Sequence, residues 1–382
     1  VTSPYSAEYG RAPGAAISVT TKSGTNSFRG TGYEYHRNEA FNATDFFTNR
    51  QGAPKPDYSL NSFGGNLGGP IVRNRAFFFG DYEGTRLTQG VTRQTVVPTE
   101  NERRGIFSTT IRDPLTGQPF PNNTIPAHRI DPVARVIMDL FPLPNASGPN
   151  NYFRTANAVD DADRYLARLD FQVTAVDSLF ARYSYTDRFR FIPGNFGGKA
   201  DGTSTSAWGR QDMTAHGLAV GWNRTFGAAV LNELRVGYNK ADSRAVQDPF
   251  GLNGPAEFGI KGVPDDPRIN GGLPGINFAA GGYRLGSPDF LPKYQLTDQL
   301  QIVDTISWLR GDHQMKFGAD LMMPMRNDFL DVPAMRGSVT FRSTFTGHVL
   351  ADFLLGYVSD AQLSNIAEVR QRIGRASCRE RV

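Results

Sequence analysis

The fold is decided by one stretch, residues 165–186, which reads YLARLDFQVTAVDSLFARYSYT. Up to Val173 every second side chain is apolar or aromatic, and the side chains between them are mostly polar. After a short turn at residues 175–178, the alternation resumes from Leu179 onward. Because successive side chains of a strand point to opposite faces, the stretch predicts two antiparallel strands joined by a tight turn, each with one apolar face.

The same alternation predicts two more hairpins. One lies within residues 294–321 and turns at residues 310–312, although Asp298 and Asp304 interrupt the apolar face of its first strand. The other lies within residues 216–239 and has leucine, valine and an aromatic residue on one face of each strand. Three hairpins of this kind indicate an all-β chain with a large antiparallel sheet.

The connections between the expected strands fall into two length classes. Some are turns of a few residues, whereas others are long and rich in Gly, Pro, Asp and Asn. Barrels that span an outer membrane segregate their connections in this way, with short turns in the periplasm and long loops outside the cell. The sequence therefore predicts a transmembrane antiparallel β-barrel with extracellular loops at about residues 38–60, 87–160, 188–211 and 241–292.

Composition is compatible with this fold and excludes another class of membrane protein. Mean hydropathy is −0.40, and no apolar run approaches the ~18 residues that a membrane helix needs. Half of each barrel strand faces a polar interior, so low hydropathy does not argue against a barrel. The 27 Phe and 14 Tyr residues suit aromatic girdles at the membrane interfaces, but they suit an ordinary β core equally well.

Several functional classes find no support in the residues. The net charge of +4 is made of interspersed charges with no basic stripe, so no nucleic-acid partner is expected. The five histidines are isolated, and no catalytic elbow or metal-ligand spacing occurs, so no catalytic, cofactor or metal site is expected. The single cysteine, Cys378, excludes an intrachain disulfide framework.

Three local patterns have a structural and a functional interpretation. The glycines of residues 64–69 could cradle a phosphate, but Pro70 stands where a phosphate loop needs lysine, so we expect strand glycines that relieve crowding. The acidic residues 160–163 could bind calcium but lack the glycine and distal glutamate of an EF loop. Residues 132–141 have helical spacing and are expected to pack within a loop.

A family resemblance is carried by residues 5–30, YSAEYGRAPGAAISVTTKSGTNSFRG. They resemble the junction between plug and barrel in TonB-dependent outer-membrane receptors, and more narrowly in the Oar-like branch. Residues 15–22 would be the last plug strand and residues 28–36 the first barrel strand. Residues 61–84 are similar to the second and third strands of that branch, residues 113–145 to its first large loop, and residues 351–356 to the start of a later strand.

The resemblance implies a division of the chain into three parts. Residues 1–24 would be the C-terminal end of the plug, and residues 25–370 a partial barrel with about nine strands of about 22. Residues 371–382 lose the strand pattern and are expected to be a non-native tail. A complete plug, preceded by a carboxypeptidase-regulatory-like domain, would lie upstream of this chain.

The resemblance also implies a function and partners. Extracellular loops would bind a small ligand, namely a siderophore, an oligosaccharide or a peptide. The TonB–ExbB–ExbD complex of the inner membrane would supply energy through a plug segment outside this chain, and the ligand would enter the periplasm. Outer-membrane lipid would surround the barrel, and no cofactor is implied.

Two sets of residues are the candidates for ligand contact. The charged side chains expected to face the barrel lumen could line the ligand path or hold the plug by ion pairs and hydrogen bonds, and we favour the second role. They are Arg168, Asp170, Arg182, Lys316 and Asp320. The extracellular-loop aromatics are Tyr152, Phe153, Phe196 and Trp208.

Two rival functions remain open on the sequence alone. A secreted β-sandwich that binds glycans or peptides would place the alternating apolar faces in a dry core. An outer-membrane adhesin or secretion-related barrel would share the fold but import nothing.

Overall fold

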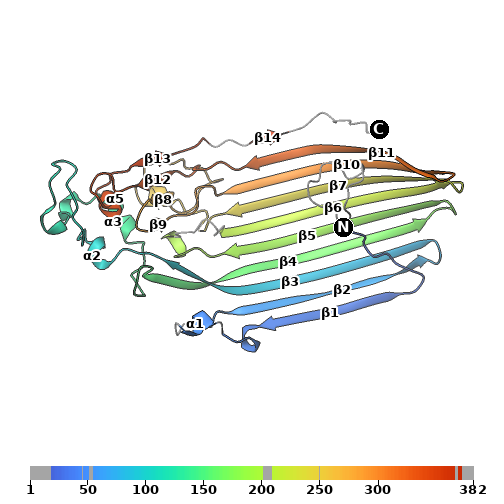
Figure 1. Ribbon diagram of the computed structural model, residues 1–382, viewed down its shortest axis with the longest axis horizontal. Coiled ribbons are helices and arrows are strands. Elements are labelled where there is room, and N and C mark those ends of the chain that lie inside the picture. Colours follow the sequence, from blue (N-terminus) through green and yellow to red (C-terminus); the bar gives the residue numbers. More distant parts are fainter. Residues whose placement is uncertain are drawn as a thin grey trace.

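The computed structural model describes residues 19–44, 46–50, 55–200, 209–248, 250–365 and 369–371. Within them, one antiparallel sheet has the strand order β1-β2-β3-β4-β5-β6-β7-β10-β11-β14 (Figure 1). Its strands are β1 (Arg29–Asn38), β2 (Tyr58–Val72), β3 (Ala76–Thr95), β4 (Tyr152–Gln172), β5 (Asp177–Ile192), β6 (Gly209–Phe226), β7 (Val230–Val246), β10 (Lys293–Arg310), β11 (His313–Leu330) and β14 (Val369–Gln371). The sheet curves but does not close, because β1 and β14 do not pair with each other in the described residues.

All three predicted hairpins are confirmed. They are β4 with β5, β6 with β7, and β10 with β11, and each pair is antiparallel. The turns between them are short and lie at one end of the sheet, and all the long connections lie at the other end (Figure 1). No helix in the described ranges is long and apolar enough to cross a membrane.

The strands extend further toward the long connections than the sequence predicted. The connection expected at residues 87–160 shrinks to residues 96–151, because β3 and β4 stay paired out to Thr95 and Tyr152. The expected loops 188–211 and 241–292 begin later for the same reason, after Ile192 and Val246. Backbone pairing continues where the apolar alternation has already faded, so hydrophobic periodicity does not mark the true strand ends.

Strand register sorts the side chains into rows that cross the sheet. One row is entirely apolar from β3 to β11, and we call the face that carries it the outer face. Its members are Phe78, Leu169, Ala181, Val220, Val236, Ile302 and Leu321. Large outer-face side chains such as Leu169, Leu218 and Phe317 are exposed, as expected of a surface that contacts lipid.

An aromatic row and then an acidic row border the outer face on the side of the long connections. The aromatic row contains Tyr82, Tyr165 and Tyr185, whose neighbouring rings lie 4.9 and 6.1 Å apart, and it continues to His216. The acidic row follows two residues further along each strand with Asp163, Asp187, Asp242 and Asp328. A girdle of aromatics followed by charge marks the expected edge of a hydrocarbon layer.

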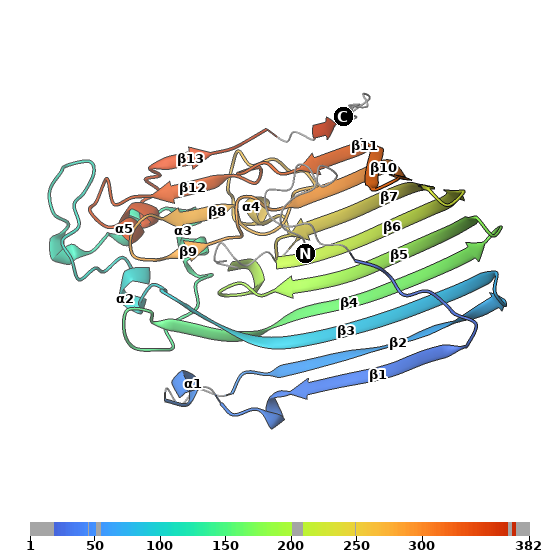
Figure 2. The same ribbon diagram turned by 45° about the vertical axis from the view of Figure 1, so that its right-hand side comes forward.

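The long connections fold together into a second unit, which we call the loop domain (Figure 2). It consists of residues 96–151, 193–200, 247–292 and 331–365 as far as these are described. Its small sheet has the order β13-β12-β8-β9, and helices pack beside it. The elements are α2 (Glu100–Arg103), η3 (Pro121–Asn123), η4 (Ala127–Arg129), α3 (Pro132–Met138), η5 (Gly198–Ala200), α4 (Gly254–Glu257), β8 (Gly275–Phe278), β9 (Arg284–Leu285), β12 (Ser338–Phe341), α5 (Val349–Leu354) and β13 (Asp360–Gln362).

The loop domain contains the main hydrophobic core of the described chain. Its fully buried members come from all the long connections except the first and third, and include Ile111, Ile125, Met138, Leu273, Ile276, Leu285, Leu350 and Leu354. The first connection contributes no residue to this core in its described part, which contains η2 (Glu39–Phe41) and α1 (Phe46–Arg50). Most of the long connections therefore form one folded unit and are not separate irregular loops.

Two local predictions in this region have opposite outcomes. The helix expected at residues 132–141 is confirmed as α3, which Asp131 caps by accepting hydrogen bonds from two backbone N–H groups. The strand expected to start at residues 351–356 is wrong, because these residues belong to the buried helix α5. Val349, Leu350 and Phe353 share its apolar side at helical spacing, and burial in the core outweighs their strand propensity.

The described residues include only part of the segments predicted at the two ends of the chain. Half of the plug strand expected at residues 15–22 falls outside the described residues, and the described half, from Val19 to Lys22, belongs to no strand. The expected first barrel strand at residues 28–36 is confirmed as β1. Of the tail expected at residues 371–382, only Gln371 is described, as the end of β14.

Candidate functional site

The five charged residues predicted to face the lumen all lie on one face of the sheet, opposite the apolar row, which we call the inner face. Arg168 pairs in register with Arg182. Asp170 and Asp320 belong to one continuous row across six strands, and Lys316 is four residues before Asp320 on β11. The register places these residues on one common face, whereas their lumen-facing position and a role in ligand passage stay predictions.

Arg168 connects the inner face to the N-terminal segment, which we define as residues 19–28. Its guanidinium donates to both carboxylate oxygens of Asp170 at 2.7 to 3.1 Å. The other nitrogen, Nη1, donates to the backbone oxygen and the hydroxyl of Thr21 at 3.1 and 2.7 Å. The ring of Phe180 lies 5.0 Å beneath the guanidinium, and only 16% of the Arg168 side chain is exposed. Such charge-assisted bonds fix both position and direction of the segment.

A close backbone approach fixes the same segment nearer the short turns. A Cβ on Gly24 would lie 2.3 Å from the backbone oxygen of Phe78 and 2.6 Å from that of Gly69. A Cβ on Gly68 would lie 3.4 Å from the Cα of Gly24. Two glycines therefore let the N-terminal segment lie directly on the sheet, as expected for strand glycines where another backbone approaches.

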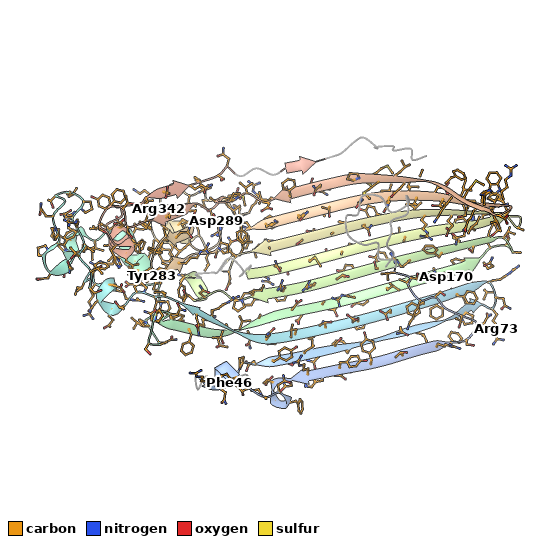
Figure 3. All side chains as sticks on the ribbon, viewed as in Figure 1. Phe46, Arg73, Asp170, Tyr283, Asp289 and Arg342 are labelled. Atoms are coloured by element: carbon orange, nitrogen blue, oxygen red, sulfur yellow. The ribbon has the colours of Figure 1, made fainter. Side chains whose placement is uncertain are left out.

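The remaining predicted charges have different surroundings. Asp320 accepts hydrogen bonds from Gln301 at 2.9 and 3.1 Å. The Nε atom of Arg182 is buried and finds no partner within the described residues. Figure 3 shows Asp170 close to the short-turn end of the sheet, far from Tyr283 in the loop domain. The charged inner face therefore begins near the short turns and continues toward the loop domain.

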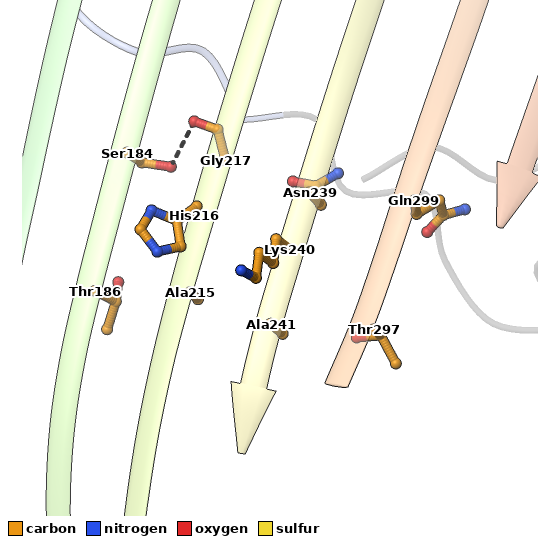
Figure 4. Close-up of a pocket in the computed structure, with 10 residues that line it drawn as sticks. All are labelled: Ser184, Thr186, Ala215, His216, Gly217, Asn239, Lys240, Ala241, Thr297 and Gln299. Carbon is orange, nitrogen blue, oxygen red and sulfur yellow. Dashed lines mark hydrogen bonds between the residues drawn. The ribbon is translucent and has the colours of Figure 1, made fainter. Parts of the chain in front are cut away.

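A hollow of about 230 Å³ lies on the inner face between these charges and the loop domain (Figure 4). Its lining residues come from β5, β6, β7 and β10, and those whose side chains face the hollow by strand alternation are uncharged and small or polar. The sequence prediction missed this hollow, although the alternating Ala215 and Gly217 on β6 were a visible sign of it. Only the register of four strands reveals which polar side chains surround these two residues.

The structure separates the loop aromatics that the sequence had grouped. Tyr152 and Phe196 pack against each other at 5.6 Å and against the loop-domain core, where Phe196 lies 5.7 Å from Phe141. Phe153 points the other way and is 39% exposed. Trp208 lies outside the described residues. Of the described three, Phe153 is the most exposed, whereas Tyr152 and Phe196 are partly buried.

Buried polar groups hold the loop domain in one conformation. The guanidinium of Arg336, which is 3% exposed, donates to backbone carbonyls of residues 271, 273, 287, 288 and 291. The carboxylate of Asp352 is fully buried and accepts from Phe345, and from the backbone and hydroxyl of Thr346. Each contact joins segments that are distant in sequence or caps α5, so the loops are fixed to one another.

Burial shifts the pKa values of two groups in this domain. Desolvation lowers the pKa of His348, although the nearby carboxylates of Glu102 and Asp352 oppose the shift. In its neutral form His348 caps α5 by accepting a hydrogen bond from the backbone of Leu350. Desolvation also raises the pKa of the Tyr283 hydroxyl, which donates to Glu102. Both groups are therefore uncharged near neutral pH.

A metal site finds no support in the part of the chain that the structure describes. No group of three or more His, Cys, Asp or Glu side chains there is arranged to hold an ion.

Comparison with known proteins places the chain in a family. The model of the outer membrane beta barrel domain family matches residues 20–377. No curated protein matches the chain. Among solved structures, the chain is similar to the outer membrane transporter YddB from Escherichia coli, with 12% sequence identity and a TM-score of 0.46 over 91% of this chain and 36% of that chain. It therefore spans little more than a third of that transporter.

The family match and the geometry agree on where the protein resides. The matched residues include every strand of the large sheet, whose outer face is apolar and bordered by an aromatic row. A soluble sandwich would instead bury such a face against a second sheet of similar size. The chain therefore belongs to the outer membrane β-barrel domain family, and its sheet is part of a barrel wall in the outer membrane.

Proposed function

We propose that the chain is part of a TonB-dependent outer-membrane transporter, which binds a small ligand at its extracellular side and imports it into the periplasm. The TonB–ExbB–ExbD complex would supply the energy through a plug segment outside this chain. The likeness of residues 5–30 to the plug–barrel junction of the Oar-like branch motivates this proposal.

The contact between Arg168 and Thr21 is the observation that carries the proposal. A transporter plug must be held inside the barrel and must also be released when energy arrives. The N-terminal segment lies on the polar inner face, held by hydrogen bonds from one guanidinium and by close packing at Gly24. Hydrogen bonds can be exchanged for others at small net cost, whereas an apolar interface would resist such a rearrangement.

The geometry also supports a direction for transport. Long connections form the loop domain at one end of the wall, and short turns lie at the other. In outer-membrane barrels the long loops are extracellular, so a ligand would meet the loop domain first. It would then pass along the inner face toward the N-terminal segment near the periplasmic turns.

An uptake measurement tests this proposal. A strain that expresses the full-length protein should accumulate its ligand, and deletion of the TonB–ExbB–ExbD genes should abolish that accumulation while the protein stays in the outer membrane. Arg168→Gln should alter the uptake rate without reducing the amount of folded barrel. Accumulation that is unaffected by loss of the energising complex would contradict the proposal.

Of the two rivals, only one is still open. The soluble secreted sandwich conflicts with the family match and with the exposed apolar outer face. An adhesin or secretion-related barrel shares the fold, and the folded loop domain would serve adhesion as well as capture. Cell attachment that depends on the loop domain, combined with no energy-dependent uptake, would favour this rival.

A further inference from the structure

The hollow on the inner face is built from two neighbouring rows of side chains. The first row consists of Ser184, Gly217, Asn239 and Gln299, which pair in register across β5, β6, β7 and β10. The second row consists of Thr186, Ala215, Ala241 and Thr297 on the same four strands. His216 and Lys240 also border the hollow, but strand alternation turns their side chains to the outer face, where His216 contacts the hydroxyl of Tyr183 at 2.8 Å.

Small residues at the centre create the space. Gly217 is the floor, with Ala215 beside it on β6 and Ala241 on β7. A Cβ on Gly217 would lie 2.7 Å from the hydroxyl of Ser184 and 3.4 Å from the amide oxygen of Asn239. These two polar groups therefore lie close above the Cα of Gly217, and a larger residue at this position would displace them.

The rim is polar and carries no charge. Three hydroxyls, from Ser184, Thr186 and Thr297, and two amides, from Asn239 and Gln299, surround the floor. Each of these groups can both donate and accept hydrogen bonds. The Ser184 hydroxyl makes only a long bond of 3.4 Å to the Gly217 carbonyl, so a better partner could replace it (Figure 4).

Three inner-face cations lie near the hollow, and two of them are paired. Arg164, next to Thr186 on β4, binds Glu83, and Arg188, two residues after Thr186, binds Asp160 at 2.6 Å. The third, Arg182, is two residues before Ser184 on β5, and its buried Nε has no partner in the part of the chain that the structure describes. The two rows that line the hollow carry no charge of their own. Paired hydroxyls and amides without a dominant charge suit a neutral ligand rich in hydroxyl groups and select against one with a strong charge.

We infer that this hollow is a binding site for a neutral polyhydroxylated ligand, of the class of short oligosaccharides. The inference rests on the proposed transport function and narrows its ligand from the three classes that the sequence left open. The volume of 230 Å³ is below the roughly 300–1,000 Å³ of pockets that enclose a drug-sized molecule, so the hollow would hold one unit of a longer chain.

Direct binding to the full-length protein in detergent tests this site. Maltohexaose and xylohexaose serve as neutral probes in titration calorimetry, and a catecholate iron complex serves as the charged alternative. At least one neutral probe should bind, and the double variant Asn239→Ala with Gln299→Ala should weaken that binding at least tenfold. Gly217→Val, which fills the hollow, should weaken it similarly.

Gln211→Ala is the matched control, because Gln211 is on the inner face of β6 but outside the two rows. It should leave binding unchanged, and a heat-modifiable band should show that every variant folds. Binding of neither neutral probe, or binding that ignores both hollow variants, would overturn the inference. The inference would also be overturned if the charged complex bound more strongly than both neutral probes and Arg182→Gln abolished that binding.

This experiment separates the site from the proposed function. Energy-dependent uptake of the iron complex without any binding of oligosaccharide would overturn the hollow as a sugar site and would leave the transporter intact. Oligosaccharide binding at the hollow without any energy-dependent uptake would support the site and would contradict the transporter.

Discussion

The barrel wall and the loop domain solve the burial problem in opposite ways. In the wall, Phe317 is 55% exposed on the outer face, and lipid supplies the apolar surroundings. In the loop domain, Phe141 is almost fully buried among side chains from several loops, including Phe196 and Phe278. The same chain therefore combines a wall whose apolar side chains face lipid with connections whose apolar side chains pack against one another.

The largest expected effect comes from deleting one aromatic ring in each region. Phe141→Ala should destabilise the loop domain by about 3–5 kcal/mol, because it leaves a cavity in a packed core. Phe317→Ala should cost much less, because lipid chains can fill the space. Thermal unfolding of the full-length protein, followed by amide hydrogen exchange in residues 96–151, measures both. Equal losses in the two variants would contradict the distinction between the regions.

A charge placed on each face of β4 tests which face meets lipid. Leu169→Arg puts a cation in the apolar row and should destabilise the barrel by about 2–4 kcal/mol, the cost near a bilayer midplane. Leu166→Arg is the matched control on the inner face and should cost little. Folding into vesicles at increasing urea concentrations measures the difference. A larger loss from Leu166→Arg would reverse the assignment of the faces.

Removal of the guanidinium at the inner face tests the attachment of the N-terminal segment. Arg168→Gln should lose hydrogen bonds of a charged group to Thr21, worth about 1.5–3 kcal/mol, and should raise amide exchange in residues 19–24. Arg182→Gln is the control, because Arg182 is on the same face but forms no hydrogen bond or ion pair with the described residues of that segment. If exchange stays unchanged in Arg168→Gln, packing at Gly24 alone holds the segment.

The smallest expected effect is a pH dependence confined to the loop domain. Folding lowers the pKa of His348 below its ordinary value of 6.5, so the unfolded form binds a proton more readily. The stabilising contribution is complete above pH 6.5 and falls as the pH drops below it. The protection factors of the α5 amides against hydrogen exchange should therefore fall between pH 7 and 5, by the equivalent of about 1 kcal/mol if the cap is lost.

His348→Asn separates titration from capping, because asparagine caps a helix but does not ionise. The variant should keep α5 protected at pH 7 and lose most of the acid sensitivity of that helix. An unchanged acid sensitivity in this variant would assign the effect to another group. The barrel wall should show no matching change over this range, since His348 lies only in the loop domain.

The sequence predicted those features that depend on local alternation. All three hairpins and the common face of Arg168, Asp170 and Asp320 follow from the period of two, which fixes side-chain direction residue by residue. Helix α3 was predictable because Asp131 caps it and its apolar residues have helical spacing. These signals all lie within a few residues of one another.

The misses are features that depend on contacts between distant segments. The segment of helix α5 was expected to start a strand. Local pattern does not show that it is buried, because its burial depends on residues more than 200 positions away, such as Ile125. Tyr152 and Phe196 resembled exposed loop aromatics, yet they pack together in the same core. The hollow at Gly217 depends on the register of four strands, which no single strand specifies.

Local alternation establishes that the chain builds an antiparallel wall with one apolar face, and it establishes which charges share the other face. Alternation is sufficient for this because each residue of a strand has only two directions available. The tertiary structure alone decided that the loops form one folded domain, where the strands end, and which polar groups converge on the inner face. Those features depend on pairing and packing between segments far apart in sequence, which local pattern does not encode.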